Sequence, residues 1–457
     1  MCFPFLLLNG CGFLEHRKRQ GMQVGKKRSI GMELFEYLNK AVTPYQAVEA
    51  AAEFLQSAGF AEQKPEETLC PERGGAYFIR LYGTGLLAYT VGEEFSEKDG
   101  MHVAAAHTDA PCLRIKPKAE HAASVYKRLD IEVYGGAILN TWFDRPLSVA
   151  GKVMLRGETA YTPKTVLVDF KRPLLTVPNL AIHMNREVNK GVEYKPQRDL
   201  LPLLGMFAEG QDKERYFTEL LAKELSVDAA DILDFDLTIY CSEQASLLGA
   251  EEEFVSAPRL DNQVSCYALL CAIRDGKHKK GLRVSVLYDH EEIGSRSKQG
   301  ADSALTVALL ERIYAGLGAS REALQAALAK SLLLSVDAAH GLHPNRQEVY
   351  DPVNRAVLNQ GVVLKINSSQ RYAFDTETVA IVQVLCEEAG VLYQKFANHG
   401  DLAGGGTLGP IISSWLPMRA IDIGVPMLAM HSARELVGKQ DIGALCNLLK
   451  RYFEDEA

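Results

Sequence analysis

Two adjacent glutamates, Glu291 and Glu292, follow the apolar run Leu282–Tyr288, which has the pattern of a buried strand. In open α/β sheets, ligands collect beyond the carboxyl ends of the strands. Neighbouring side chains leave the backbone in different directions, so one carboxylate can hold a metal ion while the other reaches a water molecule. Although an isolated Glu-Glu pair is more often a solvated acidic turn, this pair predicts a metal ligand beside a general base.

Four further residues that can bind metal follow other predicted strands or lie in adjoining turns: His107, Asp261, Asp337 and His431. Two histidines and three carboxylates, without cysteine, suit zinc, cobalt or manganese. If one carboxylate bridges two ions, each ion has three protein ligands. Such a site produces hydroxide at neutral pH and stabilises a developing oxyanion, so the set predicts hydrolysis. Taken singly, Asp261 could instead cap a helix, Asp337 could form a turn, and either histidine could be an interior hydrogen-bonding residue.

A strand–helix alternation must position these residues. A hairpin is expected from Phe78 to Val91 and a helix from Asp261 to Gly276. The other predicted strands are His102–Ala106, Leu282–Tyr288, Ser331–Val336 and Val425–Met430, and the other predicted helices are Ser303–Gly316 and Thr376–Ala389. This alternation predicts an α/β domain whose parallel sheet brings the strand ends to one edge.

The sequence between Cys112 and Glu252 has a different residue pattern, with runs of β-branched residues separated by Pro and Gly. Its predicted strands are Ile131–Tyr134, Val149–Leu155, Val166–Phe170 and Leu237–Tyr240. We therefore expect a mainly β domain at residues 112–252, inserted into a catalytic domain built from residues 32–111 and 253–457. Residues 1–31 are polar and basic after a short apolar start, and we expect them to form a disordered extension.

Composition excludes several classes of protein. The 457 residues carry a net charge of −8 and have no concentrated basic block beyond Arg17–Arg28, which argues against nucleic acid as a partner. The apolar start is too short to span a bilayer, so no membrane association is expected. Nine scattered cysteines without a CxxC pair do not resemble a disulfide framework and favour the cytoplasm.

Five ordered runs carry a resemblance to a known family: His107–Pro111, Arg259–Asn262, Asp289–Ser295, Asp337–Asn345 and Met430–Glu435. Together they closely resemble the aspartyl aminopeptidases, and the resemblance extends from about Met32 to the end of the chain. It implies an α/β/α sandwich zinc-peptidase domain carrying an inserted dimerisation domain. It also implies dimers that assemble into tetrahedral twelve-subunit shells.

The resemblance gives each candidate a role. His107 and Asp337 would hold one metal ion, Glu292 and His431 the other, and Asp261 would bridge them. Zinc is the expected ion, with cobalt and manganese as alternatives. The role of general base falls to Glu291. Asp109 would orient His107, since a carboxylate fixes the imidazole tautomer and raises its basicity.

Further matches concern the substrate. Lys365 and Tyr372 correspond to the family positions that meet the acidic side chain of the N-terminal residue. Gly406 and Thr407 lie in a run similar to the family's glycine-rich loop, although the preceding run 398–403 departs from the usual Asp-containing pattern. The segment 178–186 is similar to a loop that delivers a histidine into the neighbouring subunit, which makes His183 a candidate oxyanion donor. The roles of three more histidines stay open, and we expect structure or positioning for them: His290, His340 and His343.

The resulting hypothesis is a cytoplasmic metallo-aminopeptidase that removes N-terminal Asp or Glu from peptides with a water activated by two metal ions. A related aminopeptidase of broader or basic specificity is one alternative, because Lys365 alone cannot establish acid selectivity. A non-catalytic, self-assembling peptide-binding shell is another. The presence of Glu291 and all five ligand candidates disfavours the shell.

Overall fold

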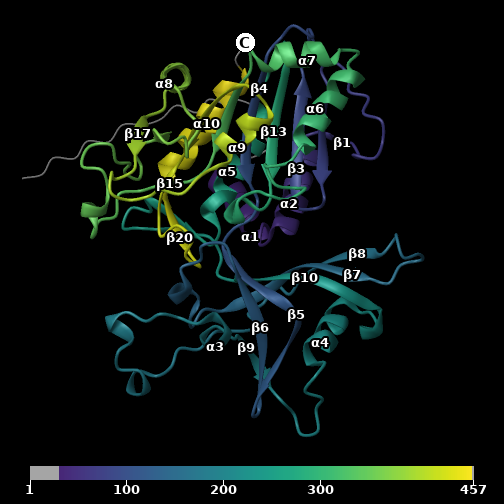
Figure 1. The fold of residues 1–457 in the computed structure, drawn as a ribbon, viewed down its shortest axis with the longest axis vertical. Coiled ribbons are helices and arrows are strands. Elements are labelled where there is room, and N and C mark those ends of the chain that lie inside the picture. Colours follow the sequence, from purple (N-terminus) through teal and green to yellow (C-terminus); the bar gives the residue numbers. More distant parts are fainter. Residues whose placement is uncertain (1–29, 455–457) are drawn as a thin grey trace, which may run out of the picture.

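The computed structural model describes residues 30–454, which form an α/β body and a separate, mainly β part (Figure 1). The extension expected at residues 1–31 lies outside the described residues except for its last two positions, which begin helix α1 (Ile30–Lys40). Within residues 30–454, no helix combines the length and the apolar character needed to cross a membrane.

The α/β body is built on a nine-stranded sheet whose central neighbours β13, β4, β14 and β18 run parallel. In spatial order its strands are β1 (Ala61–Glu62), β2 (Ala76–Leu81), β3 (Gly85–Val91), β13 (Leu282–Tyr288), β4 (Met101–His107), β14 (Leu332–Val336), β18 (Arg419–Gly424), β16 (Val362–Ile366) and β17 (Tyr393–Ala397). The predicted hairpin and the strands before His107, Glu291 and Asp337 are confirmed.

Helices cover both faces of this sheet because successive strand residues point to opposite sides. Ala104 and Ala106 belong to one apolar core, and Val103 and Ala105 belong to another. The first core is closed by α1, α2 (Pro44–Ser57), α5 (Leu260–Asp275), α8 (Thr376–Ala389) and α10 (Lys439–Glu454). The second is closed by α6 (Leu305–Gly316), α7 (Arg321–Leu328) and α9 (Leu408–Trp415). The predicted α/β/α sandwich is confirmed.

The second part is a six-stranded sheet with its own apolar core. In spatial order its strands are β8 (Lys164–Asp169), β7 (Leu147–Leu155), β10 (Ile232–Cys241), β5 (Cys112–Ala123), β6 (Tyr126–Tyr134) and β9 (Leu203–Met206). Two helices accompany it, α3 (Pro196–Asp199) and α4 (Tyr216–Leu225). We call this part the insert, because its strands lie in sequence between β4 and β13 of the large sheet.

A third, five-stranded sheet corrects one prediction. Its strands are β11 (Ser246–Leu248), β12 (Phe254–Ala257), β20 (Glu435–Gly438), β19 (Pro426–Leu428) and β15 (Ala339–His340). The strand predicted at Val425–Met430 is present as β19, but it does not belong to the large sheet as expected: β18 ends at Gly424, and the chain then joins the small sheet. Pro426 stands at the first residue of β19, where its missing amide hydrogen is tolerated.

Candidate metal centre

Neighbouring parallel strands bring three of the candidate ligands together. His107 ends β4, Glu292 lies in the 3-10 helix Glu291–Ile293 after β13, and Asp337 directly follows β14. Tyr288 of β13 is paired with His107, and Ser335 of β14 is paired with Ala105. The register therefore places all three at the same carboxyl edge of the sheet, as the sequence predicts.

Asp261 and His431 reach the cluster from the small sheet, so the expectation that one parallel sheet supplies all five ligands is wrong. Asp261 follows β12, and His431 follows β19. Both are held by Glu435 of β20, whose carboxylate accepts hydrogen bonds from the Asp261 amide at 3.0 Å and the His431 amide at 2.7 Å. Burial, reinforced by the charge of Asp261, raises the pKa of Glu435 to about 8.

Three groups of possible donors occur among the described residues: His107 with Glu291 and Glu292, and two further groups that share Asp261. His107 Nε2 lies 3.5 Å from Asp261 Oδ1 and 3.4 Å from Asp337 Oδ1. His431 Nε2 lies 3.5 Å from Asp261 Oδ2 and 3.3 Å from Glu292 Oε2. Two ligands about 2.0–2.2 Å from one tetrahedral zinc ion are about 3.3–3.6 Å apart. The donor spacing therefore fits ligands of a common ion in each group that contains Asp261.

The electrostatics of the cluster also fit cations. Burial, together with the charge of Asp261, raises the pKa of Glu292 well above its ordinary value. Asp261 Oδ1 and Glu292 Oε1 are buried and accept no hydrogen bond from the described residues. Crowded carboxylates with unused oxygens need positive charge to remain ionised. The residues present thus fit two divalent ions.

Glu291 lies at the margin of the cluster. Its side chain is 16% exposed, and its Oε2 is 4.0 Å from His107 Nε2. Burial raises its pKa to about 8; His107 opposes this shift, and the charge of Asp337 adds to it.

The Asp109 carboxylate connects His107, at the end of β4, with Glu291 and Glu292, which follow β13. Its Oδ1 lies 3.3 Å from His107 Nδ1 and accepts a hydrogen bond from the Glu291 amide at 3.1 Å. Its Oδ2 accepts from the Glu292 amide, also at 3.1 Å. With His107 Nδ1 facing Asp109, the Nε2 lone pair is directed at Asp261 and Asp337.

The candidate substrate residues lie at different depths. Lys365 of β16 is buried, with its Nζ 3.5 Å from Asp337 Oδ2 and 5.4 Å from the centre of the Tyr372 ring. Thr407 is the buried N-cap of α9, and its hydroxyl donates to the Arg371 carbonyl at 3.4 Å. Gly406 is exposed. Lys365 and Tyr372 thus adjoin the metal cluster through Asp337.

The structure does not bring His183 to the cluster of its own chain. It lies in an exposed 3-10 helix of the insert, Ile182–Met184, and within residues 30–454 no hydrogen bond or ion pair joins it to a ligand candidate.

The three histidines whose roles stayed open have other neighbours. His290 Nδ1 lies 2.8 Å from Ser297 Oγ, the His340 ring packs near Phe396, and His343 Nδ1 accepts the Asn345 amide.

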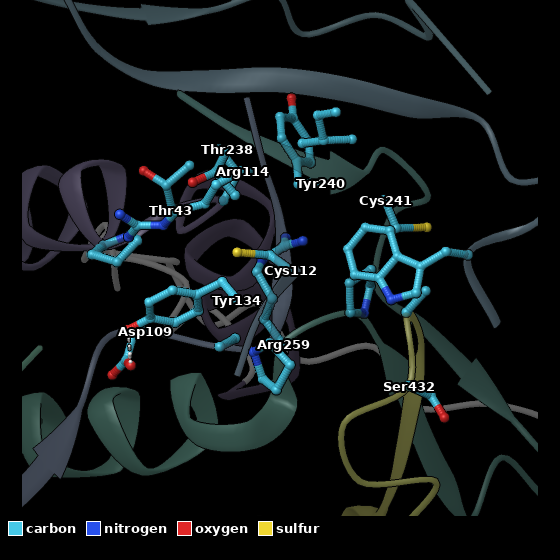
Figure 2. Close-up of a pocket in the computed structure, with 18 of the residues that line it drawn as sticks. Thr43, Asp109, Cys112, Arg114, Tyr134, Thr238, Tyr240, Cys241, Arg259 and Ser432 are labelled. Atoms are coloured by element: carbon cyan, nitrogen blue, oxygen red, sulfur yellow. Dashed lines mark hydrogen bonds between the residues drawn. The ribbon is translucent and has the colours of Figure 1, made fainter. Parts of the chain in front are cut away.

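Sequence reasoning missed three contributors. Glu435 ends the run Met430–Glu435, and a carboxylate so close to His431 in the sequence could have indicated a contact with this ligand candidate. Tyr134 and Gly136 come from the insert and have no such signal: the Tyr134 hydroxyl donates to Asp109 Oδ2 at 2.6 Å, and the Gly136 carbonyl lies 3.2 Å from His431 Nδ1. Tyr134, Asp109 and Arg114 line one pocket, and Figure 2 labels all three.

Comparisons with known proteins agree with this geometry. Residues 37–453 match the family model "Aminopeptidase I zinc metalloprotease (M18)". The chain is 43% identical over 410 residues to a "Probable M18 family aminopeptidase 2" of Clostridium acetobutylicum, covering 90% of this chain and 95% of that protein.

Solved structures show the same fold. A cryo-EM structure of the Ape4 and Nbr1 complex contains a chain 34% identical to this one, with a TM-score of 0.89 and coverage of 93% of this chain and 85% of that chain. The mApe1 dodecamer of S. cerevisiae is 26% identical, with a TM-score of 0.81 and coverage of 93% and 96%. The resemblance drawn from the five runs is confirmed at the level of the family. The chain belongs to the M18 family of zinc metallo-aminopeptidases, which are hydrolases.

Proposed function

We propose that this aminopeptidase uses two divalent metal ions to remove the N-terminal residue of peptides, preferably Asp or Glu. The observation that carries the two-ion proposal is the position of Asp261, whose two oxygens each lie 3.5 Å from a different histidine. His107 and Asp337 would hold one ion, and Glu292 and His431 the other. The zinc description of the family supports zinc, with cobalt and manganese as alternatives.

The chain's own residues divide the remaining work. When bound, two such ions polarise the scissile carbonyl and lower the pKa of water. Glu291 accepts the proton of the attacking water and returns it to the leaving nitrogen, a role suited to a carboxylate at the margin of the cluster. Asp109 keeps His107 in the tautomer that presents Nε2 to the ion.

The acidic preference rests on Lys365. Although burial by itself lowers its pKa, the charges of Asp337 and Asp422 raise it, so Lys365 stays protonated. A buried ammonium group beside the metal cluster can receive the carboxylate of an N-terminal Asp or Glu. Tyr372, packed beside Lys365, would complete this subsite, and Gly406 and Thr407 would form its outer wall.

One observation favours the alternative of broader specificity. Lys365 Nζ lies 3.5 Å from Asp337 Oδ2, so part of its charge is already neutralised within the chain. Steady-state rates on Asp-, Glu-, Lys- and Leu-anilides, each with zinc, cobalt and manganese added, decide between the two. A kcat/KM at least ten times larger for Asp and Glu supports the acidic preference, and equal values support the alternative.

We further propose that the enzyme works as an assembly in the cytoplasm. His183 lies among exposed apolar side chains, Leu180, Ile182 and Met184, in keeping with a loop that enters a second subunit. Dimers formed through the insert would assemble into a tetrahedral dodecamer, and the similar mApe1 chain is found in a dodecamer. Free thiols at the seven described cysteines are consistent with a reducing compartment.

A further inference from the structure

We infer that the insert segment Tyr134–Gly136 positions both histidine ligands, so that metal affinity depends on the docking of the insert against the catalytic body. This inference rests on the metal ligands of the proposed function and goes beyond it. It makes Tyr134 and Gly136 positioning residues, each acting on a different donor group of the cluster.

The first contact runs through Tyr134, the last residue of β6. Its hydroxyl donates to Asp109 Oδ2 at 2.6 Å, and the other oxygen of Asp109 faces His107 Nδ1 at 3.3 Å. Tyr134 is itself fixed by the insert, because the Arg114 guanidinium lies 4.4 Å from its ring centre and is anchored to Asp236 at 3.1 Å. Figure 2 shows this stack of Arg114, Tyr134 and Asp109. His107 Nδ1 also lies 3.1 Å from the Asp109 backbone carbonyl, so the insert holds a residue that faces His107 through both its carboxylate and its carbonyl.

The second contact runs through Gly136. Its carbonyl oxygen accepts a hydrogen bond from His431 Nδ1 at 3.2 Å, and two residues further on the Ile138 amide donates to the His431 carbonyl at 3.0 Å. A histidine that donates through Nδ1 has its Nε2 lone pair free for a metal. His431 Nε2 accordingly faces Asp261 and Glu292.

The segment also lies too close to the cluster for larger residues. A Cβ atom at Gly136 would lie 3.2 Å from His431 Nδ1. At Gly135, where φ is +69°, a Cβ atom would lie 3.2 Å from the Glu292 Cβ. Two consecutive glycines therefore allow the insert backbone to approach the ligands directly.

Tyr134→Phe tests the first contact, because it removes one hydroxyl and leaves the ring. Losing such an outer contact costs about 10- to 100-fold in metal affinity. Zinc retained after dialysis against graded chelator, and the visible absorption bands of the cobalt-substituted protein, both report on the site without reference to turnover. We expect weaker zinc retention and altered cobalt bands.

Tyr240→Phe is the matched control. Tyr240 is also a buried tyrosine of the insert, and its hydroxyl donates to Asp169 at 2.6 Å, away from the ligands. This control should lose thermal stability to a similar extent and keep wild-type zinc retention and cobalt bands. Equal zinc retention in Tyr134→Phe and wild type would overturn the role of Tyr134.

Gly136→Ala tests the second contact. The added methyl group should push His431 aside by a few tenths of an ångström, so one of the two ions should dissociate more readily while the other is retained. Gly205→Ala in β9 is its control, because a Cβ atom there meets nothing within 4 Å. Loss of neither ion from Gly136→Ala would overturn the role of Gly136. Wild-type protein that binds fewer than two ions would instead contradict the proposed function, which separates the two failures.

Discussion

At the scale of single residues, Glu291 and Glu292 show how surroundings separate two identical side chains. The Glu292 side chain is 3% exposed and lies 3.3 Å from His431 Nε2, whereas Glu291 is 16% exposed and stands 4.0 Å from His107. The deeper carboxylate has the contacts of a ligand. The shallower one borders the cluster at a longer distance, which suits the proposed general base.

Substitution of the two glutamates should therefore have different effects on kcat and on metal content. Glu291→Gln is expected to lose about 10²–10⁴-fold in kcat, the usual contribution of a general base, and to keep its metal. Glu292→Gln should lose metal as well as rate. Elemental analysis beside steady-state kinetics makes the comparison, and near-normal turnover by Glu291→Gln would contradict its assignment.

A second residue-scale prediction concerns Lys365. Lys365→Met should lower kcat/KM for Asp and Glu substrates relative to Leu substrates, because an unpaired buried charge costs about 2–5 kcal/mol. Lys395→Met, on the neighbouring strand β17 and exposed, is the matched control and should change neither value. If Lys365→Met slows acidic and neutral substrates equally, Lys365 serves the structure around Asp337 instead.

At the scale of elements, helix α10 closes the edge of the sheet opposite the metal centre. The Tyr452 hydroxyl donates to the Leu332 carbonyl at 2.5 Å and accepts the Val103 amide at 3.0 Å. His102, near the start of β4, stacks on the Tyr452 ring and bonds the Tyr452 carbonyl through Nδ1 at 2.6 Å. These contacts hold β4 in the position that presents His107 at its other end.

The His102 contact predicts a pH dependence of stability. Burial, assisted by the charge of Arg283, lowers the pKa of His102 from 6.5 to about 3. Between these values the unfolded chain binds the proton and the folded chain does not, so stability is present above pH 6.5 and falls as the pH drops. The slope from this group is at most about 1.4 kcal/mol per pH unit.

Urea unfolding between pH 7 and pH 4 measures this effect. His102→Gln should be less stable than wild type at pH 7 and should show a shallower decline below pH 6.5. His121→Gln in strand β5 of the insert, outside this contact, should retain the wild-type slope. An unchanged slope in His102→Gln would rule out His102 as the source.

At the scale of the whole molecule, the insert and the catalytic body meet at the candidate metal centre, and the proposed assembly would add His183 from a second subunit. His183 is exposed on the insert, far in sequence from every ligand candidate. An imidazole supplied by a second subunit would stabilise the oxyanion only after assembly, which would make activity depend on the dimer.

His183→Phe should accordingly remain assembled and metal-loaded while losing about 10²–10³-fold in kcat, the typical cost of one oxyanion donor. Mixed dimers sharpen the test. Pairing His183→Phe with Glu291→Gln places both lesions in one composite site and leaves the other intact, so about half of the wild-type activity should return, given donation to the oxyanion by one subunit. Each variant alone is the control, and the absence of recovery in purified mixed dimers would exclude donation between subunits.

The sequence by itself determined the parts of the centre that follow local patterns. Apolar runs before His107, Glu291 and Asp337 predict buried strands, because a strand buried on both faces requires consecutive apolar residues. Parallel pairing then places their ends at one edge. The run that contains Pro426 misled the same reasoning, because an apolar stretch does not reveal which of two sheets it joins.

The tertiary structure alone decided how Asp261 and His431 complete the cluster and what holds them. Glu435 bonds Asp261, 174 positions away, and His431, four positions away, and Gly136 bonds a histidine 295 positions along the chain. Such contacts depend on which surfaces pack together and at what register. Local periodicity records only whether a residue is buried and on which face, so the partners of Tyr134 and Gly136 emerge only when the insert and the catalytic body are folded against each other.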